Sequence, residues 1–304
     1  MPWIICAGLI AADLVFEVDG FPAKGTKNRA RASRMITGGG ALNAASAIAS
    51  LGGKVSLAGA IGDDIFGHFL RQKMVDRAID DQFVYTVAGA TTSRSANVIT
   101  PDGDRTIINN RDVALAPETP NFPSGFPFDA ALVDTRWPEA AAQIVQAAKR
   151  AGKPAVVDAE APVAQAQTAL EGASHIVFSE QGLADFCGGK DAEALQQAAL
   201  QLGAWCAVTR GALPVLCHDG QRLTEMPTHQ ITALNTLGAG DVWHGAFTLV
   251  LSQGRSEIEA VRWANAAASL KVSRPIQVED LPTAAEVNAL MTRQNTTRDD
   301  LNET

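Results

Sequence analysis

Residues 235–241 combine small residues with one carboxylate at the start of a predicted helix. They read Asn-Thr-Leu-Gly-Ala-Gly-Asp. Gly238 and Gly240 flank Ala239, so backbone N–H groups there can approach a ligand without interference from a Cβ atom. Helix N-termini attract anions, and Asp241 would place a base beside such a site. The pattern is typical of phosphoryl transfer to a hydroxyl group, although a simple strand-to-helix turn capped by Asp241 would look the same.

A block of glycines opens a second informative stretch. Gly38-Gly39-Gly40 starts an Ala-rich helix that contains Asn43, and Gly62-Asp63-Asp64 follows the next strand. Each part alone has an ordinary explanation, because glycines form turns and alanines pack tightly. Together and in this order, with Gly238–Asp241 about 170 residues later, they resemble the two signatures of the ribokinase/PfkB family of carbohydrate kinases. The resemblance covers about residues 4–274.

The resemblance implies a reaction and the residues that perform it. Members of the family transfer the γ-phosphoryl group of ATP to a sugar hydroxyl. By position, Asp241 matches the catalytic base, and three residues match the anion hole for the transferred group: Gly238, Ala239 and Gly240. Sugar contacts are implied for Asp13, Gly39, Gly40 and Asn43. Carboxylates and carboxamides suit vicinal hydroxyl groups, although Asp13 taken alone would be the cap of a strand end.

The nucleotide side of the site is marked less clearly. Thr209 and Gly211 resemble the Thr-x-Gly turn that meets the ATP phosphates in the family, together with Gly238 and Gly240. Asn265 falls where the family often places an adenine contact. A polar residue in a helix needs no such role, so both interpretations of Asn265 stay open.

Two positions depart from the family pattern. Asn235 stands where the family usually has Asp, which puts dependence on a monovalent cation such as potassium in doubt. The family's Asn-x-x-Glu near the metal–phosphate site falls at residues 179–182, which read Ser-Glu-Gln-Gly. Glu180 would then hold Mg²⁺ through water. Mg²⁺ itself is expected, because transfer from ATP depends on it.

Three polar residues indicate an anionic sugar. Arg136 follows a predicted central strand, at the edge where open α/β sheets bind ligands. An Arg and a Lys there would suit a fixed anion, although surface cations are normally only solvated. The stretches TIINN, VDTRWPEAA and FSEQGLADFCG are similar to those of sulfofructose kinases, a PfkB subgroup that phosphorylates the 1-hydroxyl of 6-deoxy-6-sulfofructose. In that subgroup a Lys, an Asn and an Arg grip the sulfonate, and the matching residues are Lys27, Asn109 and Arg136.

Other functions stay open at this level. A phosphate-bearing ketose would use the same cations, so fructose 6-phosphate is an alternative substrate, as are fructose, 2-keto-3-deoxygluconate and nucleosides. A non-catalytic sugar or nucleotide sensor that has kept the fold is a rival from another class. The departures at Asn235 and Ser179 favour it, and the intact loop that ends at Asp241 opposes it.

Alternating strands and helices must position these residues. Short apolar runs, typical of strands buried on both faces, recur at Ile4–Leu9, Val55–Ala60, Ala130–Asp134, Pro154–Asp158, His175–Phe178 and Ala204–Thr209. Helices are expected between them, with Pro138 at the start of one and Gly152 at its end. Ser256-x-x-Glu259 and Thr283-x-x-Glu286 are capping boxes. The pattern predicts an α/β fold with a mainly parallel sheet, and the resemblance specifies a ribokinase-like three-layer α/β/α sandwich.

Two segments that alternate polar and apolar residues predict a small β-sheet lid. They span about residues 13–36 and 83–110, and Pro101–Asp104 would form the turn of a hairpin. Residues 1–292 are therefore expected to form one kinase domain, and the polar residues 293–304 to fray. Because such lids form dimer contacts in some family members, a homodimer is expected.

Composition excludes several classes of partner. The chain has 304 residues, of which 46% are hydrophobic, and a net charge of −8. Nucleic acid and anionic membrane surfaces are therefore not expected partners. The apolar N-terminus lacks a basic start and is interrupted by Asp13, which predicts a buried strand and a cytoplasmic protein. The four cysteines have no metal-like spacing and are expected to be reduced.

Overall fold

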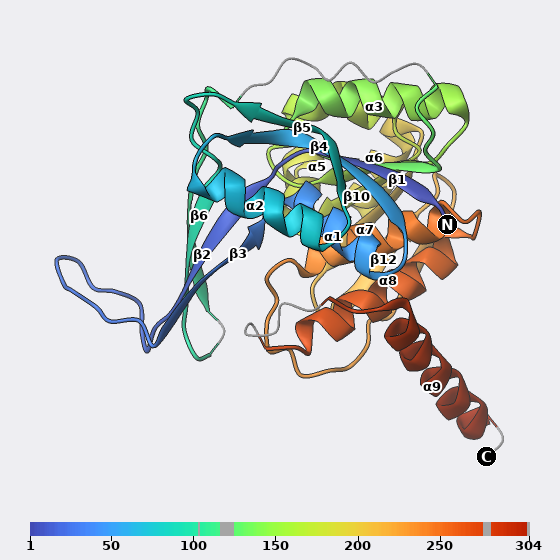
Figure 1. The fold of residues 1–304 in the computed structure, drawn as a ribbon. Coiled ribbons are helices and arrows are strands. Elements are labelled where there is room, and N and C mark those ends of the chain that lie inside the picture. The colour runs from blue at the N-terminus through green and yellow to red at the C-terminus, as the bar shows by residue number, and fades with distance from the viewer. Residues whose placement is uncertain (103, 116–124, 276–280, 303–304) are drawn as a thin grey trace.

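The centre of the molecule is a large sheet, sheet A. The computed structural model describes residues 1–102, 104–115, 125–275 and 281–302, with the backbone alone for residues 294–302. Within these residues sheet A contains β1 (Trp3–Ala7), β4 (Lys54–Gly62), β5 (Asp80–Val87), β8 (Ala130–Asp134), β9 (Ala155–Ala159), β10 (His175–Ser179), β11 (Trp205–Arg210), β12 (Leu213–His218) and β13 (Leu223–Met226). Their order across the sheet is β13-β12-β11-β10-β9-β8-β1-β4-β5 (Figure 1).

The strand directions create a ligand crevice. All neighbouring strands from β11 across to β5 pair in parallel with one another, and the β11–β12 and β12–β13 pairings are antiparallel. The chain leaves β1 on one side toward β4 and returns on the other side at β8. Such a switch point opens a crevice at the carboxyl ends of the two strands, because their connections diverge to opposite sides. Ligand-binding residues are therefore expected where β1 and β8 end.

Helices cover both faces of sheet A (Figure 1). One face packs against α1 (Gly40–Ser50), α2 (Ile65–Asp76), α7 (Ala239–Leu251), α8 (Glu257–Val272) and α9 (Ala284–Asn302). The other packs against α3 (Pro138–Ala151), the 3₁₀ turn η1 (Ala164–Ala166), α4 (Gln167–Gly172), α5 (Glu180–Cys187) and α6 (Ala192–Leu202). The predicted three-layer α/β/α sandwich is confirmed.

Several helix ends follow from local sequence. Pro138 begins α3, and Gly152 ends it in the left-handed conformation. Ser256 and Glu259 form a capping box at α8, and the Thr283 hydroxyl caps the N–H of Glu286 at α9. At the C-terminal end α9 extends to Asn302, and the fraying predicted for residues 293–304 stays a prediction. Residues 303 and 304 lie outside the described residues.

A second, smaller sheet, sheet B, lies at one side of the molecule. It consists of β3 (Ala32–Gly38), β2 (Ala11–Glu17), β6 (Arg94–Ile99) and β7 (Arg105–Asn110), in that order. The predicted hairpin is shorter than expected, because residues 80–87 form β5 at the edge of sheet A instead. Gly103, in its predicted turn, lies outside the described residues. The Arg105 guanidinium donates to Thr236 Oγ1 at 2.7 Å, so sheet B contacts the 235–241 loop.

Helices that could span a membrane are not found in the part of the chain that the structure describes.

Candidate active site

Three carboxylates meet where α1 begins. Gly39 caps this helix with φ 86°, and Gly40 is its first residue. A Cβ atom added to Gly40 would lie 3.4 Å from Oδ2 of Asp134, 3.6 Å from Oδ2 of Asp158 and 3.6 Å from Oδ1 of Asp241. These side chains come from the ends of β8 and β9 and from the first turn of α7. The fold thus brings both sequence motifs to the switch point of sheet A.

Asp241 is held by the helix that follows the glycine block. Asn43 Nδ2 donates a hydrogen bond to Asp241 Oδ2 at 2.8 Å. Burial is the largest influence on this carboxyl group and raises its pKa to about 7, with a further rise from Asp158 and opposing effects from Asn43 and His244. A carboxylate with a pKa near neutrality can both accept and release a proton under physiological conditions. Asp241 therefore has the environment of a general base.

Loop 235–241 presents backbone donors beside that base. Gly238 adopts the left-handed conformation with φ 72°, and its carbonyl accepts the first helical bond of α7 from Val242. The N–H of Ala239 turns back to the Thr236 carbonyl at 3.3 Å. Within the described residues, the N–H groups of Gly240 and Asp241 have no such acceptor. The N–H of Gly238 likewise has no acceptor among the described residues, so the amides free to meet an anion are those of Gly238, Gly240 and Asp241, and within the predicted set only the N–H of Ala239 is otherwise engaged.

We expect the pH dependence of turnover to report the Asp241–Asn43 pair. The base must be deprotonated, so kcat/KM should fall as the pH drops below about 7. Asn43→Ala removes a bond that lowers the pKa of Asp241, so this acidic limb should move to higher pH. Steady-state rates of the wild type and of Asn43→Ala from pH 5 to 9 measure where the acidic limb lies in each enzyme. A matched variant, Ser50→Ala on the last turn of α1, should leave the limb in place, and an unmoved limb in Asn43→Ala would contradict the pairing.

Three residues of the crevice were missed by the sequence analysis. Asp134 is buried, accepts from the N–H groups of Leu9 and Arg136 at 2.8 Å each, and has a pKa that burial raises to about 6. His244, one turn after Asp241, places Nδ1 3.3 Å from Asp158 Oδ2. Burial alone would lower the pKa of His244, but Asp158 and then Asp241 raise it overall. Their position in the sequence could have indicated two of these residues, because Asp134 and Asp158 each end a predicted buried strand.

On the sugar side, Asp13 borders the glycine block. A Cβ atom on Gly38 would overlap the Asp13 carboxyl group. The Ser95 hydroxyl donates to Asp13 Oδ1 at 2.6 Å, and burial raises the pKa of Asp13 despite this bond. Asp13 pairs in register with Ser95, which pairs with Asn109, so these polar residues form one row across sheet B. The structure thus joins Asp13 and Asn109 through sheet B.

The predicted anion-binding residues are only partly brought together. Arg136 Nη2 lies 3.0 Å from Glu160 Oε2, just past the end of β9. Arg111, which the sequence analysis did not single out, lies near it, since burial and then the Arg136 charge lower the pKa of Arg111. Lys27 differs, because it is exposed in the segment between β2 and β3, which extends away from the body of the molecule (Figure 1). None of the described residues forms a hydrogen bond or an ion pair with the Lys27 side chain.

The nucleotide residues lie farther along the same edge of sheet A. Ser179 and Thr209 are register partners at the ends of β10 and β11, and Gly211 forms the next turn with φ 61°. Glu180 begins α5 directly after Ser179. Asn265 lies deeper in the protein: it is 4% exposed, its Oδ1 accepts from Trp243 Nε1, and its Nδ2 donates to Pro227 O. Both polar atoms of its amide therefore have a partner inside the core, which favours an ordinary polar helix residue, while the adenine contact stays a prediction.

A resident metal ion would need several ligating side chains close together. Among the residues that the structure describes, no three or more His, Cys, Asp or Glu side chains are grouped to hold an ion. Glu180 nevertheless supplies a carboxylate just past the end of β10. Mg²⁺ usually keeps several waters and is held by one or two carboxylates plus the substrate phosphates. The residues fit an ion that arrives with ATP rather than a resident metal.

Comparisons with known proteins identify the family of this chain. Residues 1–284 match the model of the pfkB family carbohydrate kinases. Ribokinase from Bacillus subtilis is 25% identical, over 94% of this chain and 99% of its own. A crystal structure from Agrobacterium tumefaciens, provisionally named a ribokinase, shares 30% identity with a TM-score of 0.91 over 97% of this chain and 99% of that one.

A more distant solved structure supports the fold alone. Arabidopsis thaliana ribokinase complexed with ribose and ATP is 22% identical, with a TM-score of 0.77 over 95% of this chain and 99% of that one. The family match covers almost the whole chain, including both ends of the crevice. The chain therefore belongs to the pfkB family of carbohydrate kinases and is an ATP-dependent sugar kinase.

Proposed function

We propose that Asp241 is the catalytic base of this kinase. A sugar hydroxyl beside Gly40 would give its proton to the Asp241 carboxylate as its oxygen forms a bond to the γ-phosphorus of ATP. The bond from that phosphorus to the β–γ bridging oxygen breaks, and ADP leaves. The unpaired amides of Gly240 and Asp241 would stabilise the charge on the transferred group. The observation that carries this proposal is the Asn43–Asp241 hydrogen bond at the mouth of the crevice.

The sugar is proposed to lie between sheet B and the glycine block. Asp13 and Asn43 would bind its hydroxyl groups, while Gly39 and Gly40 let the backbone approach closely. The row of polar side chains on sheet B supports this position, because Asp13, Ser95 and Asn109 share one register. The Arg105–Thr236 contact would keep sheet B against the catalytic loop. Water would then be excluded from the transfer.

For the sugar itself we propose 6-deoxy-6-sulfofructose, phosphorylated at its 1-hydroxyl. Arg136 is held by Glu160 with its side chain 16% exposed, and Arg111 adds a second cation beside it. A permanent sulfonate would suit this pair and the amide of Asn109. Lys27 would complete the sulfonate site only if a second copy of the chain supplied it, since its own segment extends away. A homodimer in the cytoplasm is part of this proposal.

ATP would bind along the ends of β10 and β11. Thr209 and Gly211 lie where phosphates would pass, and Glu180 would hold Mg²⁺ through water. Mg²⁺, when bound, neutralises phosphate charge. Asn235 Oδ1 accepts the N–H of Leu237 at 3.0 Å, so this side chain orders its own loop and offers no carboxylate to a monovalent cation.

We expect Arg136→Ala to separate the sulfonated sugar from its neutral analogue. Loss of a charged hydrogen-bonding group should lower kcat/KM for 6-deoxy-6-sulfofructose roughly 10- to 100-fold, and for fructose less than about threefold. Glu160→Gln is the matched control, because it removes the ion pair and keeps the cation. Equal losses for both sugars, or an equal effect of Glu160→Gln, would count against sulfonate recognition by Arg136.

A sugar panel distinguishes the remaining substrates. The cations Arg111 and Arg136 would also accept a phosphate, so fructose 6-phosphate is the second candidate. ADP formation with MgATP should be compared for 6-deoxy-6-sulfofructose, fructose 6-phosphate, fructose, 2-keto-3-deoxygluconate and inosine. The highest kcat/KM with the sulfonated sugar would support the proposal, and a higher value with any other member would replace it.

A further inference from the structure

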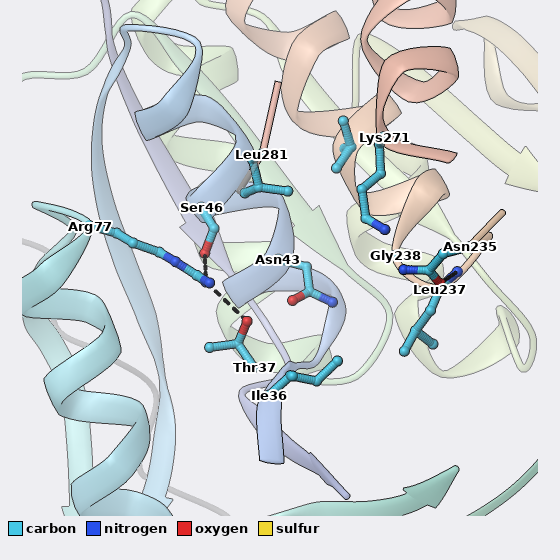
Figure 2. A pocket seen from close by; sticks show the side chains of 11 residues that line it. Ile36, Thr37, Asn43, Ser46, Arg77, Asn235, Leu237, Gly238, Lys271 and Leu281 are labelled. Carbon is cyan, nitrogen blue, oxygen red and sulfur yellow. Dashed lines mark hydrogen bonds between the residues drawn. The ribbon is translucent and has the colours of Figure 1, made fainter. Parts of the chain in front are cut away.

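Lys271 occupies a position that the phosphoryl-transfer scheme does not use. It lies in the last turn of α8, and its side chain lines a cavity of about 70 Å³ behind the catalytic loop. Asn235, Leu237 and Gly238 form one wall of this cavity, and Asn43 with Ser46 of α1 forms another. In the close view, Lys271 extends toward Asn235 and Gly238 (Figure 2). The ammonium group therefore faces the loop that would receive the transferred group.

The charges around this ammonium are unevenly distributed. Arg77, at the end of α2, is the other cation in the cavity wall, and it donates to Thr37 Oγ1 and Ser46 Oγ. None of the described lining residues is a carboxylate. Arg274, after α8, repels Lys271, and Asp241 of α7 attracts it. Asp241 is thus the carboxylate that acts on Lys271 among the described residues.

Backbone hydrogen bonds also connect the end of α8, which carries Lys271, to the catalytic loop. The carbonyl of Val272, the next residue, accepts the N–H of Leu234 at 2.7 Å and the N–H of Asn235 at 3.1 Å. The entry of the catalytic loop is therefore fixed to the end of the helix that carries Lys271. Along the described chain no hydrogen bond or ion pair engages its ammonium, so the charge is not cancelled by a close partner.

We propose that Lys271 is a positioning residue, whose ammonium supplies a built-in positive charge behind the catalytic loop. The inference rests on the proposed role of Asp241 and the loop amides. A fixed cation in a sheltered cavity would favour the negative charge that develops on the transferred group, because screening by solvent is weak there. It would also make a soluble monovalent cation unnecessary at this loop. This accounts for an Asn at position 235, since an Asp there would neutralise the lysine.

The predicted consequence is a limit at alkaline pH. Burial, and then repulsion by Arg274, lower the pKa of Lys271 to about 8, while Asp241 partly opposes this shift. The group is charged below that pH and loses its charge above it. The profile of kcat/KM, which reports the free enzyme, should therefore fall above about pH 8. If Lys271 only stabilised the C-terminal end of α8 through its charge, loss of that charge above pH 8 would not lower kcat/KM.

The test compares wild-type enzyme with Lys271→Arg and Lys271→Met, from pH 6 to 10 in buffers without sodium or potassium. Each is assayed with MgATP and the sugar of highest kcat/KM in the panel. Arginine stays charged, so its alkaline limb should move up by more than about one pH unit. The methionine variant should lose about tenfold in kcat at pH 7, with the sugar KM changed less than about twofold. Added KCl, but not tetramethylammonium chloride, should restore part of that loss.

Several results would overturn this inference. One is a wild-type kcat in Lys271→Met, and another is an alkaline limb that does not move in Lys271→Arg. A third is equal recovery of kcat in Lys271→Met with KCl and with tetramethylammonium chloride, which would indicate an effect of general ionic strength. Thermal unfolding of each variant identifies a folding defect, and the arginine variant decides the matter if the methionine variant does not fold. The proposed function has its own test, because a turnover near the wild-type value in Asp241→Asn would contradict the catalytic base and leave the Lys271 measurements to be judged separately. An inactive Asp241→Asn beside unchanged Lys271 variants would remove this inference alone.

Discussion

Asp241→Asn should lower kcat by about 10²- to 10⁴-fold, the contribution expected of a positioned general base. Asparagine has nearly the same shape, and its side-chain oxygen can still accept the Asn43 bond. The loop and the sugar contacts should therefore persist, and the KM for sugar should change less than about threefold. Rates of ADP formation at saturating MgATP and varied sugar measure both constants.

A matched carboxylate controls for the loss of buried charge. Asp134→Asn removes another raised-pKa carboxyl group of the same crevice, but Asp134 accepts its hydrogen bonds from the backbone N–H groups of Leu9 and Arg136. Its effect should fall mainly on thermal stability, with a smaller loss of kcat than Asp241→Asn. If Asp241→Asn keeps kcat within about threefold of the wild type, Asp241 is not the base.

The second large effect is expected at Gly39. Its φ of 86° disfavours any L side chain, and a Cβ atom there would overlap the carbonyl oxygen of Leu9. Gly39→Ala must therefore displace either the start of α1 or the loop after β1, both of which form the crevice. We expect a loss of about 3 kcal/mol or more in the free energy of unfolding, together with loss of turnover. Chemical denaturation and steady-state rates measure the two effects.

Gly52 provides the control for backbone strain alone. Its φ of 87° is almost the same, but a Cβ atom there would meet nothing within 4 Å. Gly52→Ala should therefore cost only about 1–2 kcal/mol and leave kcat near the wild-type value. Equal destabilisation by the two substitutions would show that the overlap with Leu9 has no energetic weight.

The sandwich could be predicted because its strands are continuous apolar runs. Ile4–Leu9 and Ala130–Asp134 are buried on both faces in the structure, as a parallel sheet requires. β5 was misassigned to the lid because it is an edge strand. Its residues are mostly half-buried or exposed, so it has the same alternation as a strand of a small outer sheet. The pattern of polarity does not tell which sheet a half-exposed strand joins.

The site was predictable where its residues are adjacent in sequence. Gly238–Asp241 and Gly38–Asn43 each form a local turn and helix start, and the structure joins them through one hydrogen bond. The Asp158–His244 pair comes from a strand end and a helix far apart in the chain, so neither residue type indicated the other. For Asn265 the sequence leaves two interpretations open, because a buried polar residue with partners inside the core resembles a ligand contact in sequence.

The most direct test of the account is the product formed by wild-type enzyme and by Asp241→Asn from MgATP and 6-deoxy-6-sulfofructose. Coupled ADP detection and phosphorus NMR should be applied to the same reaction. We expect one ADP for each sugar 1-phosphate with the wild type, negligible ADP without sugar, and negligible product with the variant. Equal ADP formation with and without every sugar of the panel, or full product from the variant, would contradict a sugar kinase that works through Asp241.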